Sequence, residues 1–291
     1  MPAIWHDLHW VFQLRSAEMT VVMNGFTALG YTPFFLACLP LGYWLWDKDL
    51  FTRLAVLIML TALLNAFLKD AFQDPRPDLA FALDPRVGDS YGMPSGHAQV
   101  ATAMWLWLAY ELRRPWLWLV SIVIVLGVSF SRLYLGVHDV EDVAVGIGAG
   151  LACIGIFRLL LSDRLQRWHD LHPALQLVLL LALQPVMWLL WPRQEGPGGA
   201  SAILAFLFGW WAGVLYDRHR MDFKRHPNWG IAIIAAAVGI ALLFAALGPL
   251  ERGLLGAGLD TATATWVQML LVALYTTAIA PLLFRLARAA H

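Results

Sequence analysis

The residues best suited to chemistry gather in three short segments at the ends of long apolar runs. One of these segments, residues 131–142, reads SRLYLGVHDVED and holds His138 and Asp142 four positions apart. On a helix this spacing puts both side chains on one face, where a carboxylate can accept from one imidazole nitrogen and leave the other lone pair directed outward. The pair is predicted to be an oriented nucleophile or base. The structural alternative is a buried ion pair that stabilises the bend.

Basic residues lie in the same segment as this pair and in a second segment. Arg132, at the far end of the LYLGV bend, carries a planar guanidinium suited to two phosphate oxygens. Lys69 and Arg76 belong to the segment KDAFQDPRP, whose prolines restrict the backbone around the arginine. Taken alone, this segment is more typical of a lysine that extends to the membrane surface and of an arginine in a solvated loop than of a phosphate site.

The third segment is PSGH at residues 94–97, which opens an apolar run. Ser95 is a suitable N-cap and Gly96 leaves its amide unshielded, so that free N–H groups and the positive end of the helix dipole favour an oxyanion, phosphate above all. An ordinary helix cap beside a solvated His97 is the alternative interpretation. Function is favoured if all three segments lie at one depth in the membrane, because ionisable groups there are usually functional.

In chain order the segments read K-x6-RP, PSGH and SR-x5-H-x3-D. This combination resembles the type 2 phosphatidic acid phosphatase family, an integral membrane branch of a superfamily that also contains vanadium haloperoxidases and glucose-6-phosphatase. The resemblance covers roughly residues 50–160, and chance agreement at so many fixed positions is negligible. A multi-span C-terminal extension departs from the usual helical core of the family. Upstream of the first motif the sequence predicts two spans and an in-plane helix, where three spans are common.

The resemblance implies a phosphatase that works through a phosphohistidine. The residues that would hold the phosphoryl oxygens are Lys69, Arg76, Ser95, Gly96 and Arg132. His138 would attack phosphorus, Asp142 would orient its ring, and His97 would protonate the departing oxygen and then activate water. No metal ion and no other cofactor is expected.

The composition predicts that membrane-spanning helices position these three segments. Hydrophobic residues make up 60% of the 291-residue chain and charged residues only 14%, far below the charge of soluble domains. A helical span needs about 20 mostly apolar residues. Nine segments approach that length: 27–46, 51–68, 94–112, 116–132, 140–161, 175–192, 200–216, 230–248 and 265–284. The expected fold is all-α, a polytopic transmembrane bundle preceded by an N-terminal interfacial helix with Trp5 and Trp10.

The distribution of Lys and Arg predicts the orientation. With nine spans, 13 of the 20 basic residues fall on one side and 7 on the other, and the richer side should be cytoplasmic. The loop at 70–93, His97 and His138 should then face outward. The expected location is a multi-pass protein of a bacterial inner (plasma) membrane, with an extracytoplasmic active site.

Two domains are predicted: a catalytic transmembrane core at 1–163 and additional transmembrane helices of unassigned role at 175–291. In the latter, the basic segment DRHRMDFKRH at 217–226 fits either contact with anionic lipid headgroups or the positive-inside rule alone. Glycines with the spacing of close helix packing are Gly146, Gly148 and Gly150. Acidic residues expected to be solvated, some of them tuning access to the site, are Asp74, Asp78, Asp84, Asp89, Asp139 and Glu141.

The predicted function is removal of a terminal phosphate monoester or pyrophosphate from a lipid. Candidate substrates are a polyprenyl pyrophosphate, phosphatidic acid, phosphatidylglycerophosphate and a sphingoid phosphate. Besides this phosphorylated lipid, the expected partners are membrane lipids; net charge +0 suggests no nucleic acid, and a homo-oligomer is compatible with the sequence. The alternatives are a lipid phosphotransferase and a non-catalytic lipid transporter or binding protein. A haloperoxidase is disfavoured by the number of spans.

Overall fold

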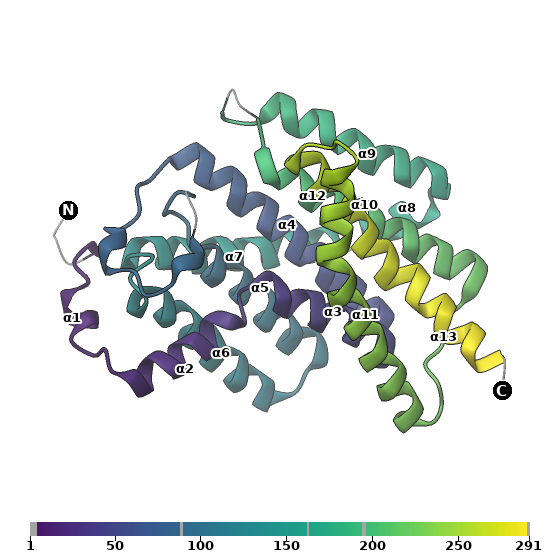
Figure 1. The fold of residues 1–291 in the computed structure, drawn as a ribbon, viewed down its shortest axis with the longest axis horizontal. Helices are drawn as coiled ribbons and strands as arrows, with labels where there is room; N and C mark the ends of the chain where they lie inside the picture. The colour runs from purple at the N-terminus through teal and green to yellow at the C-terminus, as the bar shows by residue number, and fades with distance from the viewer. Residues whose placement is uncertain (1–4, 88–89, 162, 194–195, 290–291) are drawn as a thin grey trace. The chain divides into compact units, whose positions relative to one another are not determined.

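The structure, a computed structural model, describes residues 5–87, 90–161, 163–193 and 196–289 (Figure 1). All regular secondary structure in these ranges is helical, which confirms the predicted fold class. Within these ranges, seven continuous helical stretches of 18 to 28 residues are long and apolar enough to cross a membrane, among them Gly198–Met221 and Thr261–Arg288, and an eighth span is added if a bent pair is counted as one. The remaining predicted span, 94–112, corresponds to the 17-residue helix α5, which is shorter than those helices.

The helices of the N-terminal part are α1 (His9–Phe12), α2 (Ala17–Ala28), α3 (Thr32–Leu45), α4 (Lys48–Phe72), α5 (Gly96–Leu112), α6 (Pro115–Tyr134) and α7 (Val140–Leu160), with the short η2 (Leu79–Phe81) and η3 (Pro85–Val87) between α4 and α5. The helices of the C-terminal part are α8 (Asp163–Asp170), α9 (Pro173–Leu190), η4 (Gly198–Ala200), α10 (Ser201–Tyr216), η5 (Asp217–Met221), α11 (Trp229–Gly256), α12 (Thr261–Leu274), η6 (Tyr275–Ile279) and α13 (Ala280–Ala289).

The N-terminal region differs from the expectation. Where an interfacial helix was predicted, the described residues form only the one-turn α1. Helix α2 then begins at Ala17, because the Ser16 side chain accepts from the Met19 amide at 3.1 Å and caps it. The predicted straight span at 27–46 is instead the bent pair α2 and α3, which meet at 53°. A Cβ at Gly30, within the bend, would lie 2.3 Å from the His97 ring, so glycine allows this close approach.

The chain forms two compact units. The first contains residues 1–35 and 60–162, and the second contains residues 36–59 and 163–291. In the first unit, α5 packs against α6 and α7, and α2 packs against α6. In the second unit, α10 packs against α9 and α12, and α11 packs against α12. The division into 1–163 and 175–291 remains a prediction.

Glycines bring α7 close to α5 inside the first unit. A Cβ at Gly146 would lie 2.7 Å from the Ser95 carbonyl oxygen, and one at Gly150 would lie 2.6 Å from the Gln99 carbonyl oxygen. The prediction of close packing is therefore confirmed at these two positions. It is wrong for Gly148, where a Cβ would meet no atom of the described residues within 4 Å. The result is that the first turns of α5 and α7 lie side by side.

Candidate active site

His138 lies in the turn between α6 and α7, with a side chain only 2% exposed. Its Nδ1 is 2.8 Å from Oδ2 of Asp142, one turn into α7, and its Nε2 is 3.2 Å from Nη1 of Arg76. Because arginine can only donate, Nε2 faces it as an acceptor, and the ring proton is on Nδ1, directed at the carboxylate. The imidazole therefore carries an oriented lone pair on Nε2.

The environment of this ring favours its neutral form. Burial, followed by the positive charges of Arg76, Lys69 and Arg132, lowers the pKa of His138 well below its ordinary value. Burial, together with the charge of Arg132, also lowers the pKa of Arg76, to about 10, which leaves that guanidinium charged at neutral pH. The ring is thus an uncharged base beside three cations.

The start of α7 fixes Asp142 in place. Asp139 is the N-cap, and its Oδ1 accepts from the Asp142 amide at 2.9 Å. In return, Oδ2 of Asp142 accepts from the Asp139 amide at 3.3 Å, which completes a capping box. Asp139 is 5% exposed and also lies 2.5 Å from Nδ1 of His6, so its prediction as a solvated residue is wrong. Glu141 is exposed, as expected.

Neutral oxygens, most of them in the loop between α4 and α5, accept hydrogen bonds from Arg76 and Lys69. Arg76 donates from Nε to the Ser90 carbonyl at 2.6 Å and from Nη2 to the Ser90 hydroxyl at 2.8 Å. It also donates from Nη1 to the Val137 carbonyl at 2.6 Å. Lys69, in the last turn of α4, donates to the carbonyls of Tyr91 and Gly92, the latter at 2.8 Å. All these acceptors are neutral, so they orient the two cations without cancelling their charge.

At and beside the start of α5, several buried polar groups lack hydrogen-bond partners among the described residues. Ser95 is the N-cap residue and is completely buried, yet its hydroxyl makes no capping bond. Buried polar atoms with no hydrogen-bond partner among the described residues include Ser95 Oγ, His97 Nε2, Arg132 Nε and Asp142 Oδ1. Unsatisfied buried groups are costly, and a cluster of them suggests that a polar ligand completes their hydrogen bonds.

Arg132, at the end of α6, is 2% exposed and pairs with Asp84, which the sequence analysis predicted to be solvated. Its Nη1 donates to the Thr27 hydroxyl and, at 3.1 Å, to Oδ2 of Asp84. The Asp84 carboxylate is completely buried and also accepts from Nε of Arg86 at 2.9 Å and from the Tyr31 hydroxyl. The prediction that Asp84 is solvated is therefore wrong. The loop turns inward just before η3 because three donors converge on the Asp84 carboxylate.

Electrostatics at Asp84 follow from these contacts. Burial acts to raise the pKa of its carboxyl group, but hydrogen bonds from Arg86 and Tyr31 and the charge of Arg132 hold that pKa below its usual range. The other loop carboxylates differ: Asp78 is exposed, as expected, and caps η2 by accepting from the Ala80 amide at 2.9 Å. Asp74 is half-buried, and burial, then the charge of Asp139, raises its pKa. Asp89 lies outside the described residues.

Two buried amide side chains, Asn65 of α4 and Gln99 of α5, join these helices, and the sequence analysis did not predict this contact. Nδ2 of Asn65 donates to the Pro94 carbonyl at 3.1 Å and to Oε1 of Gln99 at 2.8 Å. A Cβ at Gly96 would lie 2.9 Å from Oδ1 of Asn65, so Gly96 allows α4 to approach the start of α5. The available signal was the presence of polar side chains inside apolar spans, one turn before Lys69 and just after PSGH.

The eight predicted residues therefore meet in one unit. The His138 ring contacts Arg76 and Asp142, and the Ser95 amide donates to the Asp142 carbonyl at 2.9 Å. On the other flank, the Tyr31 ring packs edge-on against His97 with centroids 4.5 Å apart, and it lies 5.8 Å from the guanidinium carbon of Arg132. Two imidazoles and three cations thus belong to the first unit, around the starts of α5 and α7.

Comparison with known proteins identifies the family of this chain. Residues 50–166 match the PAP2 superfamily, and residues 201–291 match the PAP2 superfamily phosphatase, transmembrane extension. Phosphatidylglycerophosphatase B of Bacillus subtilis (strain 168) is 33% identical over 152 residues, which cover 47% of this chain and 73% of that protein. Sphingosine-1-phosphate phosphatase 2 of Mus musculus is 32% identical over 148 residues, but the chain spans only 42% of its length.

Among solved structures, the first transmembrane PAP2 type phosphatidylglycerolphosphate phosphatase from Bacillus subtilis aligns with a TM-score of 0.46 and 25% identity, over 52% of this chain and 80% of that one. The two family matches and the similarity to phosphatidylglycerophosphatase B show the family of this chain. This chain belongs to the PAP2 superfamily and carries its transmembrane extension, as an integral, multi-pass membrane protein.

Proposed function

We propose that this protein is a membrane lipid phosphatase that removes a terminal phosphate through a phosphohistidine at His138. The observation that carries the proposal is the pair of contacts on this ring: Nδ1 is 2.8 Å from Asp142, and Nε2 faces Arg76 at 3.2 Å. The lone pair that would attack phosphorus thus points at a cation that would bind the phosphoryl oxygens. Asp142 stabilises the positive charge that develops on the ring.

In the first step, the Nε2 lone pair of His138 forms a bond to phosphorus, and the bond from phosphorus to the lipid oxygen breaks. The departing oxygen takes a proton from His97. A bound phosphate dianion favours the charged imidazolium of His97, whose Nε2 has no hydrogen-bond partner among the described residues. In the second step, water gives a proton to His97 while its oxygen attacks phosphorus, and inorganic phosphate leaves His138.

Lys69, Arg76 and Arg132 supply the charge that this chemistry needs. Phosphoryl transfer spreads negative charge over the three equatorial oxygens, and fixed cations in a buried site stabilise it without reorganisation. The Ser95 hydroxyl and the Gly96 amide at the start of α5 complete the proposed cradle. Both lie where the helix dipole is positive.

A lipid phosphate is the substrate class we propose. By their names, the relatives act on sphingosine 1-phosphate, on phosphatidylglycerophosphate and, for the Helicobacter pylori protein, on the 1-phosphate of lipid A. In this chain the loop that bears Asp84 also exposes apolar side chains: Leu79 is 51% exposed, Phe81 50% and Leu83 43%. Exposed apolar groups beside a phosphate site suit a ligand that is itself embedded in lipid.

The location of the site follows from charge. The positive-inside count, 13 basic residues against 7, supports an active site on the extracytoplasmic face of a bacterial inner membrane. There the starts of α5 and α7 would lie at headgroup depth.

The test is release of inorganic phosphate from a panel of lipid phosphates by the purified full chain, with and without a chelator. His138→Ala should lower turnover by on the order of 10³-fold or more, since no other group replaces the nucleophile. His9→Ala is the matched control, because the His9 side chain is 83% exposed and pairs with Asp7. Full activity of His138→Ala would refute the nucleophile, and loss of activity with chelator would refute metal-independent chemistry.

The same experiment separates the alternatives. Transfer of labelled phosphate to a second lipid, in place of release, would identify a phosphotransferase. Binding of the lipid phosphate without either product would identify a transporter or binding protein.

A further inference from the structure

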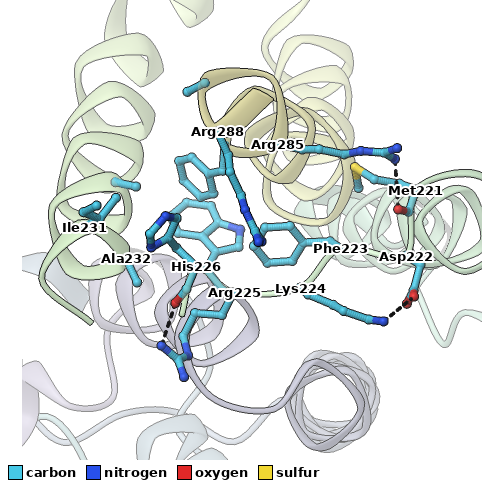
Figure 2. Close-up of a pocket in the computed structure, with 14 residues that line it drawn as sticks. Met221, Asp222, Phe223, Lys224, Arg225, His226, Ile231, Ala232, Arg285 and Arg288 are labelled. Carbon is cyan, nitrogen blue, oxygen red and sulfur yellow. Dashed lines mark hydrogen bonds and ion pairs between the residues drawn. The ribbon is translucent and has the colours of Figure 1, made fainter. Parts of the chain in front are cut away.

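The second unit contains a cavity of about 590 Å³ that plays no part in the proposed chemistry (Figure 2). It is formed by the segment after η5, the first turns of α11 and the last turns of α13. This volume is in the range of sites for small ligands, roughly 300–1,000 Å³.

Aromatic rings form one side of the cavity. Trp44 and Phe284 pack edge-on with centroids 5.3 Å apart, and Phe223 lies 6.3 Å from Phe284. The indole N–H of Trp44 already donates to the Thr276 carbonyl at 2.7 Å. This side therefore offers an apolar surface.

Cationic side chains and small or aliphatic side chains also line the cavity. Arg225 donates to the His226 carbonyl at 2.8 Å and lies 3.7 Å over the Trp229 ring, and Arg285 donates to the Met221 carbonyl at 3.0 Å. Both hydrogen-bond partners are backbone carbonyls, so these contacts do not pair either guanidinium group with a carboxylate. Figure 2 shows the Arg288 side chain running into the space between His226 and Phe223.

One carboxylate occurs among the described lining residues, and it does not neutralise the arginines. Asp222 lies 3.1 Å from Nζ of Lys224 and 3.4 Å from Nζ of Lys48. The arginines Arg225, Arg285 and Arg288 therefore leave an excess of positive charge in a cavity with one aromatic side. A ligand of matching chemistry is an amphiphile with a negatively charged head.

The cavity wall is held in place by a buried carboxylate. Asp217, at the start of η5, accepts from Nζ of Lys48 at 2.8 Å and from the Phe223 amide at 2.7 Å, and the Tyr43 hydroxyl lies 3.3 Å away. The chain then turns at Asp222, which has a left-handed φ of 46°. Because these bonds fix the segment between η5 and α11, a ligand would meet a site that is already formed.

We propose that this cavity binds the phosphate headgroup of an anionic membrane lipid. Guanidinium groups match pairs of phosphate oxygens, and the aromatic side suits the glycerol and the first carbons of the acyl chains. The positive-inside count predicts that residues 217–226 are cytoplasmic, where anionic lipids attract basic side chains. The inference does not depend on the chemistry at His138.

The test measures the melting temperature of the purified full chain in neutral detergent during titration with short-chain phosphatidylglycerol. Phosphatidylcholine with the same chains and inorganic phosphate are the comparison ligands. Phosphatidylglycerol has no terminal phosphate monoester, so it probes the cavity apart from the catalytic reaction. We expect phosphatidylglycerol to raise Tm where phosphatidylcholine does not, and to raise it equally in the wild type and in His138→Ala.

The variant Arg225→Gln with Arg288→Gln should bind phosphatidylglycerol about tenfold more weakly or worse, since each basic residue near the surface contributes to binding of an anionic lipid. Arg220→Gln is the matched control, because Arg220 is an exposed arginine of the same segment outside the cavity. If the double variant does not fold, Arg288→Lys should keep most of the affinity that Arg288→Gln loses. The proposal is overturned if phosphatidylcholine gives the same stabilisation, if inorganic phosphate gives a stabilisation of the same size that the cavity variants lose, or if those variants bind phosphatidylglycerol as the wild type does.

Discussion

Two neighbours decide what the His138 ring can do. Asp142 takes the proton side of the ring at 2.8 Å, and Arg76 lies on the lone-pair side at 3.2 Å. A ring with the opposite tautomer would direct a proton at Arg76 and a lone pair at a carboxylate, which is unfavourable on both sides. Asp142 is therefore a positioning residue in the proposed reaction.

We predict that Asp142→Asn lowers kcat by on the order of 10²-fold or more while changing KM little, because the amide can donate to Nδ1 and so favour the wrong tautomer. The measurement is steady-state phosphate release from a lipid phosphate. Glu141→Gln, an exposed carboxylate on the same turn of α7, should be close to wild type. Equal losses in the two variants would contradict the role of Asp142 in orienting the ring.

Asp84 matters at the same scale because it pairs with a buried arginine. Its side chain accepts from Arg132 and Arg86, and removing its charge leaves Arg132 buried and uncompensated. We predict that Asp84→Asn lowers the free energy of unfolding by on the order of 3 kcal/mol at neutral pH. Asp78→Asn is the control, because asparagine caps a helix about as well as aspartate does.

The pH dependence of this effect has a definite sign. Since the pKa of Asp84 is depressed in the folded protein, its stabilisation is present above its unfolded pKa, near 3.9, and is lost as pH falls through the lower folded value. Melting temperatures between pH 3 and 8 should show a difference between wild type and Asp84→Asn that is constant above about pH 5 and shrinks below about pH 4. A difference that grows on acidification would contradict this assignment.

At the scale of elements, the site depends on the distance between α5 and α7. Helix α5 carries His97 and is preceded by Ser95 as its N-cap, and α7 carries Asp142; Gly146 is the residue of α7 that lies against the backbone of Ser95. A methyl group there would meet the Ser95 carbonyl oxygen at 2.7 Å, and a backbone atom cannot rotate away as a flexible side chain can.

We predict that Gly146→Ala costs about 1–3 kcal/mol of stability and also lowers kcat, because it separates the two helix starts. The matched control is Gly148→Ala, two residues along the same helix, where the added methyl group meets open space. That variant should be neutral or more stable by up to about 1 kcal/mol, as alanine is the better helix former. Thermal unfolding and phosphate release together check both; an equal loss at Gly148 would show that helix propensity, not packing, dominates.

For the whole molecule, the question is which side of the membrane each loop faces. The N-terminal segment belongs to the same end of the first unit as the site, since Nε of Arg15 donates to the Tyr134 carbonyl at 3.0 Å. An odd number of crossings would then put the two ends of the chain on opposite sides. The basic segment at 217–226 should face the cytoplasm.

We predict that Leu79→Cys, on the exposed loop of the first unit, reacts with an impermeant maleimide in intact spheroplasts. Arg220→Cys should react only after the membrane is permeabilised. Both are made in a chain with Cys38 and Cys153 replaced by alanine. Labelling with the opposite sidedness would contradict the predicted orientation and the extracytoplasmic site.

Some features of the fold were readable from local sequence and others were not. Long apolar runs predicted the helices that are long enough to span a membrane, because in lipid only a helix satisfies its own backbone within a single segment. The bend between α2 and α3 was missed, since nothing in its apolar sequence marks the close approach of Gly30 to His97. Likewise, an aspartate in a loop rich in turn residues looks solvated until Arg132, 48 residues away, is placed beside it.

The sequence by itself determined the residue types of the site, their order and the helix ends that carry them, because spacing within one turn is a local property. It determined the pairing of His138 with Asp142 for the same reason. Only the tertiary structure decided that Arg76 faces the lone pair, that Asp84 is buried against Arg132, and that Asn65 supports the start of α5. These contacts join segments far apart in the chain, and their positions depend on packing and on shared hydrogen bonds, which no short stretch of sequence contains.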